Sequence, residues 1–490
     1  PTPQDSSAAS DVYKRQDLLI IGGGINGVGI ARDASGRGLK VTLIEKGDLA
    51  SKTSSWSTKL IHGGIRYLEN YEFRLVRESL KEREVIRKIA PHITKPIRFV
   101  LPHVPSLRPT WLIRLGLMLY DWMGGFISFP KSKVVNLGTD YNENPIKSNF
   151  ITGYEYSDLF VDDARLVLLN AQDAISRGAK ICTNSKVQKV VRKKNYWEVF
   201  LSNGEVLQSK VIINASGPYV LDVLKNIIGI ESKKKIRHVQ GSHIITEKLY
   251  VGEQAYILQL SDKRIIFLIP YLDKFTLIGT TDHEVKTYDN PEITDIEKNY
   301  LIKSVNKFIK KEITEDDIIW TYSGVRPLVE DLNENASKIT RDYTFEIDDN
   351  GAPILTIFGG KLTTYRKLSE HALKKISKYI KITNKSWTGN EILPGAKEIL
   401  DKNFLIPEKL LKRLIKTYGD KIINLNQYYQ SFMDGGEHIF EDLYEFEIKY
   451  LVQEEMAKTP EDILFRRTKL GIKFPKEKLA ILENILKKYI

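Results

Sequence analysis

The chain has 490 residues, of which 42% are hydrophobic and 28% charged, so it is long enough for a large core and for more than one domain. Its one cysteine, Cys182, excludes an intrachain disulfide framework, and no CxxC pair or HExxH helix predicts a metal site. The net charge of +12 favours anionic partners such as membrane surfaces or acidic small molecules. The basic runs lack the repeated aromatic residues of a base-stacking surface, and we expect no nucleic-acid partner.

Residues 1–16 are polar and small, and they lack the apolar segment of a signal peptide. We interpret them as a disordered or non-native tail. No apolar run in the chain approaches the roughly 20 residues that cross a bilayer. The sequence therefore predicts folded domains that begin near residue 17.

The folded part opens with a strand, a helix and a second strand. Residues 17–22 (DLLIIG) are apolar and end at glycine, a helix is expected near residues 25–37, and residues 40–45 (KVTLIE) form the next strand. This β-α-β order is typical of a parallel sheet.

The remaining elements alternate between helices and strands until about residue 380. We expect helices at 71–89 and 165–177, and strands at 181–191, 197–201 and 211–214. Antiparallel strands are predicted at 256–260, 264–270 and 275–279, and a hairpin turn at 349–351 precedes a strand at 354–358 and a helix to about 380. Beyond residue 383 the pattern is helical and lysine-rich, without clear strands.

A glycine fingerprint, GGGINGVG at residues 22–29, joins the first strand to the first helix. In the spacing Gly22-x-Gly24-x-x-Gly27, the first glycine permits a tight turn, the second lets the backbone approach a pyrophosphate, and the third lets helix and strand pack closely. The free N–H groups at the start of the helix favour phosphate. Glu45 ends the second strand 18 residues after Gly27, where an acid can accept hydrogen bonds from a ribose. Together these features predict a dinucleotide site.

Six further motifs carry a family resemblance. They are the hydroxyl-rich loop Thr53-Ser54-Ser55, KLIHGGIRYLE (59–69), EYSDLFVDDARL (155–166), QGSHII (240–245), YSGVRPL (322–328) and FGGKLTTYR (358–366). With the fingerprint, they make the chain resemble the FAD-dependent glycerol-3-phosphate dehydrogenases of the respiratory, aerobic type, within the superfamily of D-amino-acid oxidase. The resemblance runs from about residue 17 to the C-terminus.

The resemblance implies the fold and its division. We expect an α/β protein in which a Rossmann-like FAD-binding domain is interleaved with an antiparallel-sheet substrate domain, both within residues 17–385. Residues 386–490 are expected to form an α-helical C-terminal domain.

The resemblance also implies the residues that bind FAD. His62, Gly63 and Gly64 are expected beside the isoalloxazine ring, which a backbone approaches closely where no Cβ intervenes. The full expected set is Gly22, Gly24, Ile25, Asn26, Gly27, Glu45, Thr53, Ser54, Ser55, Lys59, Leu60, His62, Gly63, Gly64, Val187, Ala215, Gly217, Gly360, Lys361, Leu362 and Thr363.

Three cations, Arg66, Arg326 and Lys361, are the expected anchors of a phosphate dianion, because arginine binds it bidentately and lysine adds a point charge. Tyr67 and His243 complete the expected substrate site. The expected catalytic residues are His243, His62 and Arg326, and either histidine is a candidate for the base that removes the hydroxyl proton. No metal is expected.

The implied reaction is the oxidation of sn-glycerol 3-phosphate to dihydroxyacetone phosphate by hydride transfer to the flavin, with electrons passed to membrane quinone. The sequence leaves two alternatives open: a glycerol-3-phosphate oxidase that uses oxygen, and a basic flavoprotein that acts on nucleic acid. The implied location is cytoplasmic, peripherally bound to the inner face of the cell membrane, and a homodimer is expected.

An apolar stripe between residues 108 and 125 bears on membrane binding. Its members share one face of a predicted helix: Trp111, Leu115, Met118, Leu119 and Trp122. Such a stripe packs either into a core or onto an anionic membrane surface, where tryptophan and the nearby Arg108 and Arg114 are favoured.

Overall fold

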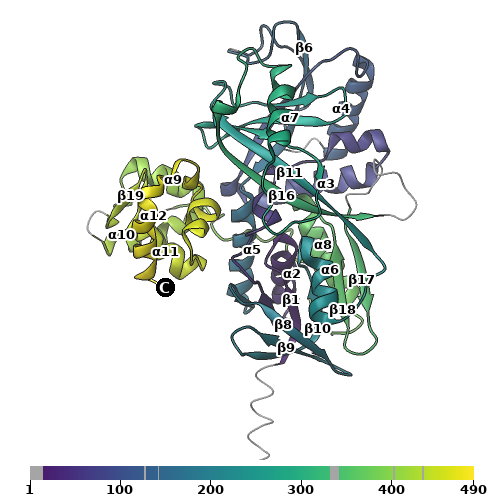
Figure 1. Cartoon of the computed structure of the whole chain (residues 1–490), viewed down its shortest axis with the longest axis vertical. Coiled ribbons are helices and arrows are strands. Elements are labelled where there is room, and N and C mark those ends of the chain that lie inside the picture. The colour runs from purple at the N-terminus through teal and green to yellow at the C-terminus, as the bar shows by residue number, and fades with distance from the viewer. Residues whose placement is uncertain (1–14, 126–127, 142, 331–341, 401–402, 433–434) are drawn as a thin grey trace, which may run out of the picture.

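The structure, a computed structural model, describes residues 15–125, 128–141, 143–330, 342–400, 403–432 and 435–490 (Figure 1). The expected tail lies outside these residues except for its last two. Arg15 and Gln16 are in the first strand, β1 (Arg15–Ile21), where they pair with Gln208 and Ser209. The strand therefore begins two residues earlier than predicted, because its pairing with β10 extends on the N-terminal side beyond its first apolar residue.

The first sheet has a parallel centre in the order β17-β18-β10-β1-β2-β7, and only the pairing of β17 with β18 in that series is antiparallel. Its strands are β1, β2 (Val41–Ile44), β7 (Lys180–Cys182), β8 (Val187–Arg192), β9 (Trp197–Leu201), β10 (Val206–Asn214), β17 (Thr344–Asp348) and β18 (Ile354–Phe358). Helix α2 (Ile25–Gly36) packs against α5 (Asp163–Ser176) and α8 (Tyr365–Ile376). The predicted β-α-β opening is confirmed.

The second sheet is mostly antiparallel, with β12 and β4 as its parallel pair. Its strands are β3 (Leu60–Ile61), β4 (Thr94–Pro102), β5 (Lys133–Asn136), β6 (Thr152–Val161), β11 (Lys235–Glu247), β12 (Ala255–Gln259), β13 (Ile265–Tyr271), β14 (Phe275–Gly279), β15 (His283–Glu284) and β16 (Ile318–Glu330). The hairpins predicted to join β12, β13 and β14 are confirmed.

The chain alternates between the two sheets. It builds β1 and β2 in the first, β3–β6 in the second, β7–β10 in the first, β11–β16 in the second, and β17 and β18 in the first. The predicted interleaved α/β architecture is therefore confirmed. Two of these crossings, residues 45–59 and residues 215–234, contribute residues to the same cavity.

Helices α3 (Phe73–Ile89), α4 (Thr110–Gly124) and α7 (Asp295–Asn306) accompany the second sheet. The predicted stripe on α4 faces outward: Trp111 is 65% exposed, Met118 57% and Trp122 67%. The interpretation of this stripe as core is wrong. The buried face of α4 consists of Ile113, Leu117, Tyr120 and Met123.

The C-terminal helices, yellow in Figure 1, form a body of their own beside α5 and have a separate hydrophobic core. They are α9 (Glu408–Tyr418), α10 (Ile422–Gln430), α11 (Glu445–Glu455) and α12 (Leu479–Lys487), with a π-helix, η11 (Asp462–Arg467). The expectation of no strands here is wrong in detail, since β19 (His438–Phe440) and β20 (Leu443–Tyr444) pair as a very short hairpin. The boundary near residue 385 stays a prediction.

Within the described ranges, every helix is too short or too polar to span a bilayer.

Candidate functional site

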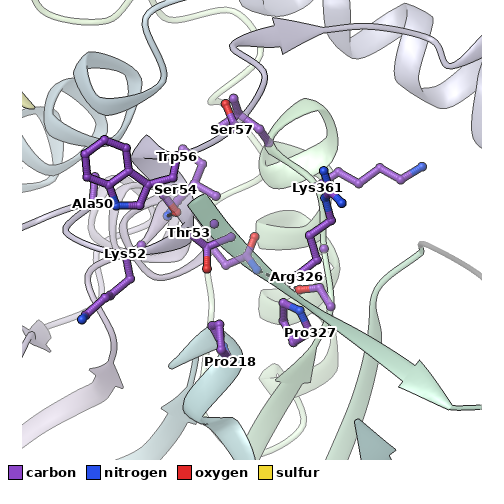
Figure 2. Close-up of a pocket in the computed structure, with 18 of the residues that line it drawn as sticks. Ala50, Lys52, Thr53, Ser54, Trp56, Ser57, Pro218, Arg326, Pro327 and Lys361 are labelled. Carbon is purple, nitrogen blue, oxygen red and sulfur yellow. Dashed lines mark hydrogen bonds between the residues drawn. The ribbon is translucent and has the colours of Figure 1, made fainter. Parts of the chain in front are cut away.

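A cavity of about 990 Å³ lies between the two sheets, lined in part by the crossing that follows β2 and the crossing that follows β10. Figure 2 shows Ala50, Lys52 and other residues of the 50–57 loop on one side of it and Arg326, Pro327 and Lys361 on the other. The glycine turn after β1 and the segment Ala215–Gly217 after β10 also line it. The carboxyl ends of parallel strands therefore open into this cavity, as in other dinucleotide folds.

The glycine turn needs its glycines for three different reasons. Gly22 has a φ of +114°, and a Cβ there would lie 2.6 Å from the Ala215 carbonyl oxygen. A Cβ on Gly27 would lie 1.9 Å from the Gly22 carbonyl oxygen, so this glycine lets α2 pack on β1 as predicted. A Cβ on Gly24 would meet the Ser54 hydroxyl at 3.1 Å, on the cavity side of the turn. The second glycine thus leaves the backbone accessible from the cavity.

Glu45 fastens this turn. One of its carboxylate oxygens accepts a hydrogen bond from the Gly23 N–H at 2.6 Å, and the other accepts from the Gly47 N–H at 2.8 Å. Burial raises the pKa of Glu45, although both hydrogen bonds act to lower it. Because each carboxylate oxygen has two lone pairs, Glu45 can still accept hydrogen bonds from a ribose in the cavity.

The hydroxyl-rich loop, which includes η1 (Thr53–Ser55), is hydrogen-bonded to β16 and to the start of α2. Thr53 Oγ1 donates to the Val325 carbonyl oxygen of β16 at 2.8 Å, and Ser54 Oγ accepts from the Ile25 N–H, at the start of α2, at 3.0 Å. Ser55 is only 1% exposed and faces the interior rather than the cavity. Two of the three predicted hydroxyls therefore lie at the cavity.

The pair Gly63-Gly64 has a packing role that the sequence did not indicate. A Cβ on Gly63 would lie 2.6 Å from the Leu80 side chain and 2.7 Å from the Tyr120 ring. Gly64 has a φ of +73°, and a Cβ there would lie 2.3 Å from the Tyr67 ring. Side chains of the protein itself therefore require glycine at these two positions, whether or not a flavin ring lies beside them.

Lys59 belongs to the interior. Its Nζ donates to both carboxylate oxygens of Asp163, at 2.9 and 3.0 Å, and to the Ser55 carbonyl oxygen at 2.9 Å. Both side chains are nearly inaccessible to solvent. Burial lowers the pKa of Lys59, and the adjacent Asp163 carboxylate opposes that shift. This lysine holds the loop in place and is turned away from the cavity.

Asn26 connects α2 to the glycine pair that follows β18. Its Nδ2 donates to the Gly359 carbonyl oxygen at 3.2 Å. Gly359 and Gly360 have φ values of +73° and +102°, so this turn requires glycine twice. The buried Asn26 Oδ1 has no hydrogen-bond partner among the described residues. It is an acceptor left for a ligand.

The cations predicted to bind phosphate differ in the hydrogen-bond partners that the protein gives them. Lys361 Nζ is buried at the cavity without a hydrogen-bond partner among the described residues, and it lies 4.0 Å from the centre of the Tyr67 ring. Arg326 Nη1 donates to Asp282 Oδ1 at 2.7 Å, and its Nη2 donates to Thr280 Oγ1 at 3.3 Å. Arg66 lies in η2 (Ile65–Asn70), and its side chain is outside the described residues.

The two candidate histidines differ in their access to the cavity. His62 lines it. His243 is 1% exposed, stacks on Tyr322, and reaches the wall through a 3.0 Å contact between its Nε2 and Thr58 Oγ1. Burial, together with the positive charges of Arg326 and Lys59, holds the pKa of His243 well below its ordinary value of 6.5. The ring is therefore neutral at physiological pH.

Asp158 is a cavity residue that the sequence reasoning missed. It is 3% exposed and accepts hydrogen bonds from the Tyr120 hydroxyl at 2.6 Å and from Arg83 Nη1 at 3.1 Å. Burial raises the pKa of Asp158 to about 6, despite the opposing charge of Arg83. The Tyr120 hydroxyl in turn accepts from the Gly63 N–H at 2.9 Å. An acid within an apolar strand was the sequence signal that could have identified it.

Most of the predicted site residues meet in this one cavity. Those that line it are Gly22, Gly24, Ile25, Asn26, Glu45, Thr53, Ser54, Leu60, His62, Gly64, Tyr67, Val187, Ala215, Gly217, Arg326, Gly360, Lys361, Leu362 and Thr363. Those placed behind the wall are Gly27, Ser55, Lys59, Gly63 and His243. Lining residues that were not predicted include Lys46, Lys52, Thr58, Asp158, Lys186 and Gly241.

The cavity fits a dinucleotide cofactor such as FAD. The glycine turn and the start of α2 would hold its pyrophosphate, and Glu45 would accept from its ribose. The unpartnered Asn26 Oδ1 and the Cβ-free approach at Gly24 are consistent with a bound group at this end of the cavity.

Comparisons with known proteins agree with this geometry. Residues 17–366 match the FAD dependent oxidoreductase family, and residues 386–488 match the C-terminal domain of alpha-glycerophosphate oxidase. The chain is 45% identical to the aerobic glycerol-3-phosphate dehydrogenase of Escherichia coli over 477 residues, which cover 93% of this chain and 94% of that one. It is also 45% identical to the D-erythritol 1-phosphate dehydrogenase of Brucella abortus over 472 residues, covering 92% and 94%.

Among solved structures, the glycerol-3-phosphate dehydrogenase from Bacillus halodurans complexed with FAD is similar, with a TM-score of 0.75 and 26% identity over 99% of this chain and 96% of that one. The family match extends over well more than half of the chain and includes every element that lines the cavity. This chain therefore belongs to the family of FAD-dependent oxidoreductases.

Proposed function

We propose that this protein is an FAD-dependent glycerol-3-phosphate dehydrogenase, which oxidises sn-glycerol 3-phosphate to dihydroxyacetone phosphate. The observation that carries the proposal is the buried Lys361 ammonium, which has no hydrogen-bond partner among the described residues and lies at the cavity. The Tyr67 ring 4.0 Å away balances this charge only in part, and a phosphate dianion would supply the missing hydrogen-bond acceptor and counter-charge. Three relatives at 45–46% identity are glycerol-3-phosphate dehydrogenases, which supports the same substrate.

The phosphate is bound by Lys361 and Arg326, with Arg66 as the third cation. Arg326 already pairs with Asp282, so the substrate phosphate competes with a carboxylate for its guanidinium. Lys361 has no such competitor and contributes the larger share of the binding free energy. Because the phosphate is held at one end of a small substrate, the position of its C2 atom is fixed. Binding of the phosphate therefore orients C2 for the reaction.

FAD, when bound, supplies the acceptor for the hydride that leaves C2. The proton of the C2 hydroxyl goes to a protein base. His62 lines the cavity and can take the proton directly, whereas His243 receives it through the Thr58 hydroxyl. Replacing Thr58 with valine distinguishes the two routes, because it interrupts the second and leaves His62 in place.

A second candidate substrate is D-erythritol 1-phosphate, on which a relative of equal identity acts. It carries the same terminal phosphate and is longer by one CHOH unit, so the same cations would bind it. The ratio of kcat/KM for the two substrates decides between them.

The proposed electron acceptor is membrane quinone. The aromatic side chains exposed on α4 support peripheral binding to an anionic membrane at the inner face of the cell membrane. The homodimer expected from the sequence stays a prediction.

The deciding experiment adds sn-glycerol 3-phosphate to the purified flavin-containing protein without oxygen and follows the visible flavin absorption. Rapid bleaching is the expected result. Reoxidation by a soluble quinone without hydrogen peroxide supports the dehydrogenase, and stoichiometric peroxide in air supports the oxidase. A yellow, folded protein that neither phosphate bleaches would contradict the proposal.

A further inference from the structure

One short stretch of the C-terminal helical body, residues 462–469, contacts the cofactor side of the molecule. The stretch begins as the π-helix η11 and contains Arg466 and Arg467, which are 6% and 1% exposed. π-helical turns are rare and occur often at functional sites. Two buried arginines in succession require acidic partners. Arg466 pairs with Asp462 of the same stretch, and both arginines pair with one acid from far away in the chain.

Their shared partner is Asp48, which is 5% exposed. Arg466 Nε donates to Asp48 Oδ2 at 2.6 Å, and Arg467 Nη2 donates to Asp48 Oδ1 at 2.8 Å. Arg467 also donates to the Glu455 carbonyl oxygen at 2.7 Å, and the Glu455 carboxylate pairs with Arg165 of α5 at 2.6 Å. The Asp48 carboxylate is thus held by donors from the C-terminal body.

Asp48 lies in the loop that completes the proposed ribose and pyrophosphate site. The N–H of the preceding residue, Gly47, donates to Glu45 at 2.8 Å. On the other side, the Ser51 N–H donates to the Asp48 carbonyl oxygen at 3.2 Å, and the Ala50 N–H donates to the Gly23 carbonyl oxygen at 3.1 Å. A shift of Asp48 would therefore disturb Glu45 and the glycine turn together.

The same stretch supports the hydroxyl-rich loop as well. Phe465 stacks on Trp320, with ring centres 5.0 Å apart and an angle of 12° between the planes, and Trp320 lies 5.8 Å from the cavity residue Trp56. Lys469 Nζ pairs with Asp162 Oδ1 at 3.3 Å, next to the acid that binds Lys59. Residues 462–469 thus contact Asp48 directly and reach the hydroxyl-rich loop through Trp320 and Asp162.

We propose that residues 462–469 of the C-terminal body hold the cofactor loop, residues 46–57, in the conformation that binds FAD, with Arg467 as the main positioning residue. The inference rests on the proposed cofactor site. A loop that is already ordered loses less conformational entropy when its ligand binds, so the contact with Asp48 raises affinity without touching the ligand. The C-terminal body is, on this view, part of the apparatus for cofactor retention.

The test compares FAD affinity in full-length apoprotein variants, measured from the change in flavin fluorescence at a temperature well below unfolding. Arg467→Met keeps the apolar stem and removes the contact with Asp48, and the FAD dissociation constant should rise about tenfold, which is about 1.4 kcal/mol. Arg467→Lys restores a charge beside Asp48 and should recover part of the affinity. Asp48→Asn weakens the contact from the opposite side and serves if Arg467→Met does not fold.

Arg413→Met is the matched control. It removes an ion pair with the buried Glu447 inside the C-terminal body, far along the chain from Asp48. This variant should lower the thermal stability of the protein and leave the FAD dissociation constant unchanged. Unchanged affinity in both Arg467→Met and Asp48→Asn, or equal weakening in Arg413→Met, would overturn the inference. Wild-type apoprotein that does not bind FAD would instead overturn the proposed cofactor site.

Discussion

Lys59, which lies behind the cavity wall, and Lys361, which lines the cavity, differ in how their charges are balanced. The Lys59 ammonium makes three hydrogen bonds, two of them to the inaccessible Asp163, whereas the Lys361 ammonium is buried without a hydrogen-bond partner among the described residues. Lys59 directly precedes β3 and Lys361 follows β18, and both lysines were predicted as ligand contacts. The comparison teaches that a buried cation is available for a ligand only where the fold has not already supplied its counter-charge.

The largest expected effect tests the paired lysine. Lys59→Met leaves the Asp163 carboxylate inaccessible and without its counter-ion, so stability should fall by about 3–5 kcal/mol. The shift of the urea midpoint measures this loss. Lys361→Met is the matched control and should be no less stable than the wild type, because it leaves no carboxylate unpaired. The reverse pattern would contradict the comparison.

Asp158 shows that a counter-charge does not always offset burial. It pairs with Arg83, and its pKa is still raised from 3.8 to about 6, chiefly by burial. A carboxyl whose pKa is higher in the folded state contributes its full stability below pH 3.8 and loses it as the pH rises through about 6. Relative to the wild type, Asp158→Asn should therefore gain about 3 kcal/mol of stability between pH 4 and pH 7. Unfolding curves across this range measure the difference, and a constant offset would show that Asp158 does not titrate there.

The unpaired lysine is tested by catalysis. Lys361→Met should lower kcat/KM for sn-glycerol 3-phosphate about 100-fold, or about 2.7 kcal/mol, chiefly through a higher KM, because a charge-assisted hydrogen bond to the phosphate is lost. Steady-state kinetics with a soluble quinone give both constants. Lys378→Met, at an exposed lysine paired with Asp349, should change neither. A normal KM in Lys361→Met would remove the main support for the phosphate site.

The smallest expected effect is on membrane binding by the exposed apolar side chains of α4. The double variant Trp111→Ser/Trp122→Ser should weaken binding to anionic vesicles about tenfold, while turnover with a soluble quinone stays normal. Co-sedimentation with vesicles measures the change. Ile296→Ser removes a still more exposed apolar residue, 82% accessible, from α7 and serves as the control. Equal losses in both proteins would show that α4 has no special role.

The sequence predicted those features whose causes are local. The turn from Gly22 to Gly27 and the acid Glu45 follow from strand and helix periodicity over about 25 residues, and the structure gathers them at one cavity. The ion pair of Lys59 could not be predicted, because its partner, Asp163, is 104 residues away in the chain. The need for glycine at position 63 likewise comes from distant packing, against Leu80 and Tyr120.

Patterns that are compatible with two environments were the other source of error. The apolar stripe of α4 has the spacing of a core helix, and only the tertiary structure shows that the opposite face is the buried one. The hairpin formed by β19 and β20 has strands of three and two residues, which are too short to produce a sequence pattern.

The interleaving of the two sheets also has a consequence for biosynthesis. The parallel sheet places β1 between β2 and β10 and places β18 beyond β10, so paired residues such as Arg15 and Gln208 are separated by almost 200 residues of chain. A ribosome must therefore release β18, which ends at Phe358, before the sheet can close around the cavity. Pairings of such long sequence separation form slowly and leave strand edges exposed meanwhile. We expect the nascent chain to depend on chaperones until β18 has emerged from the ribosome. We also expect that a chain truncated before Phe358 does not retain the flavin.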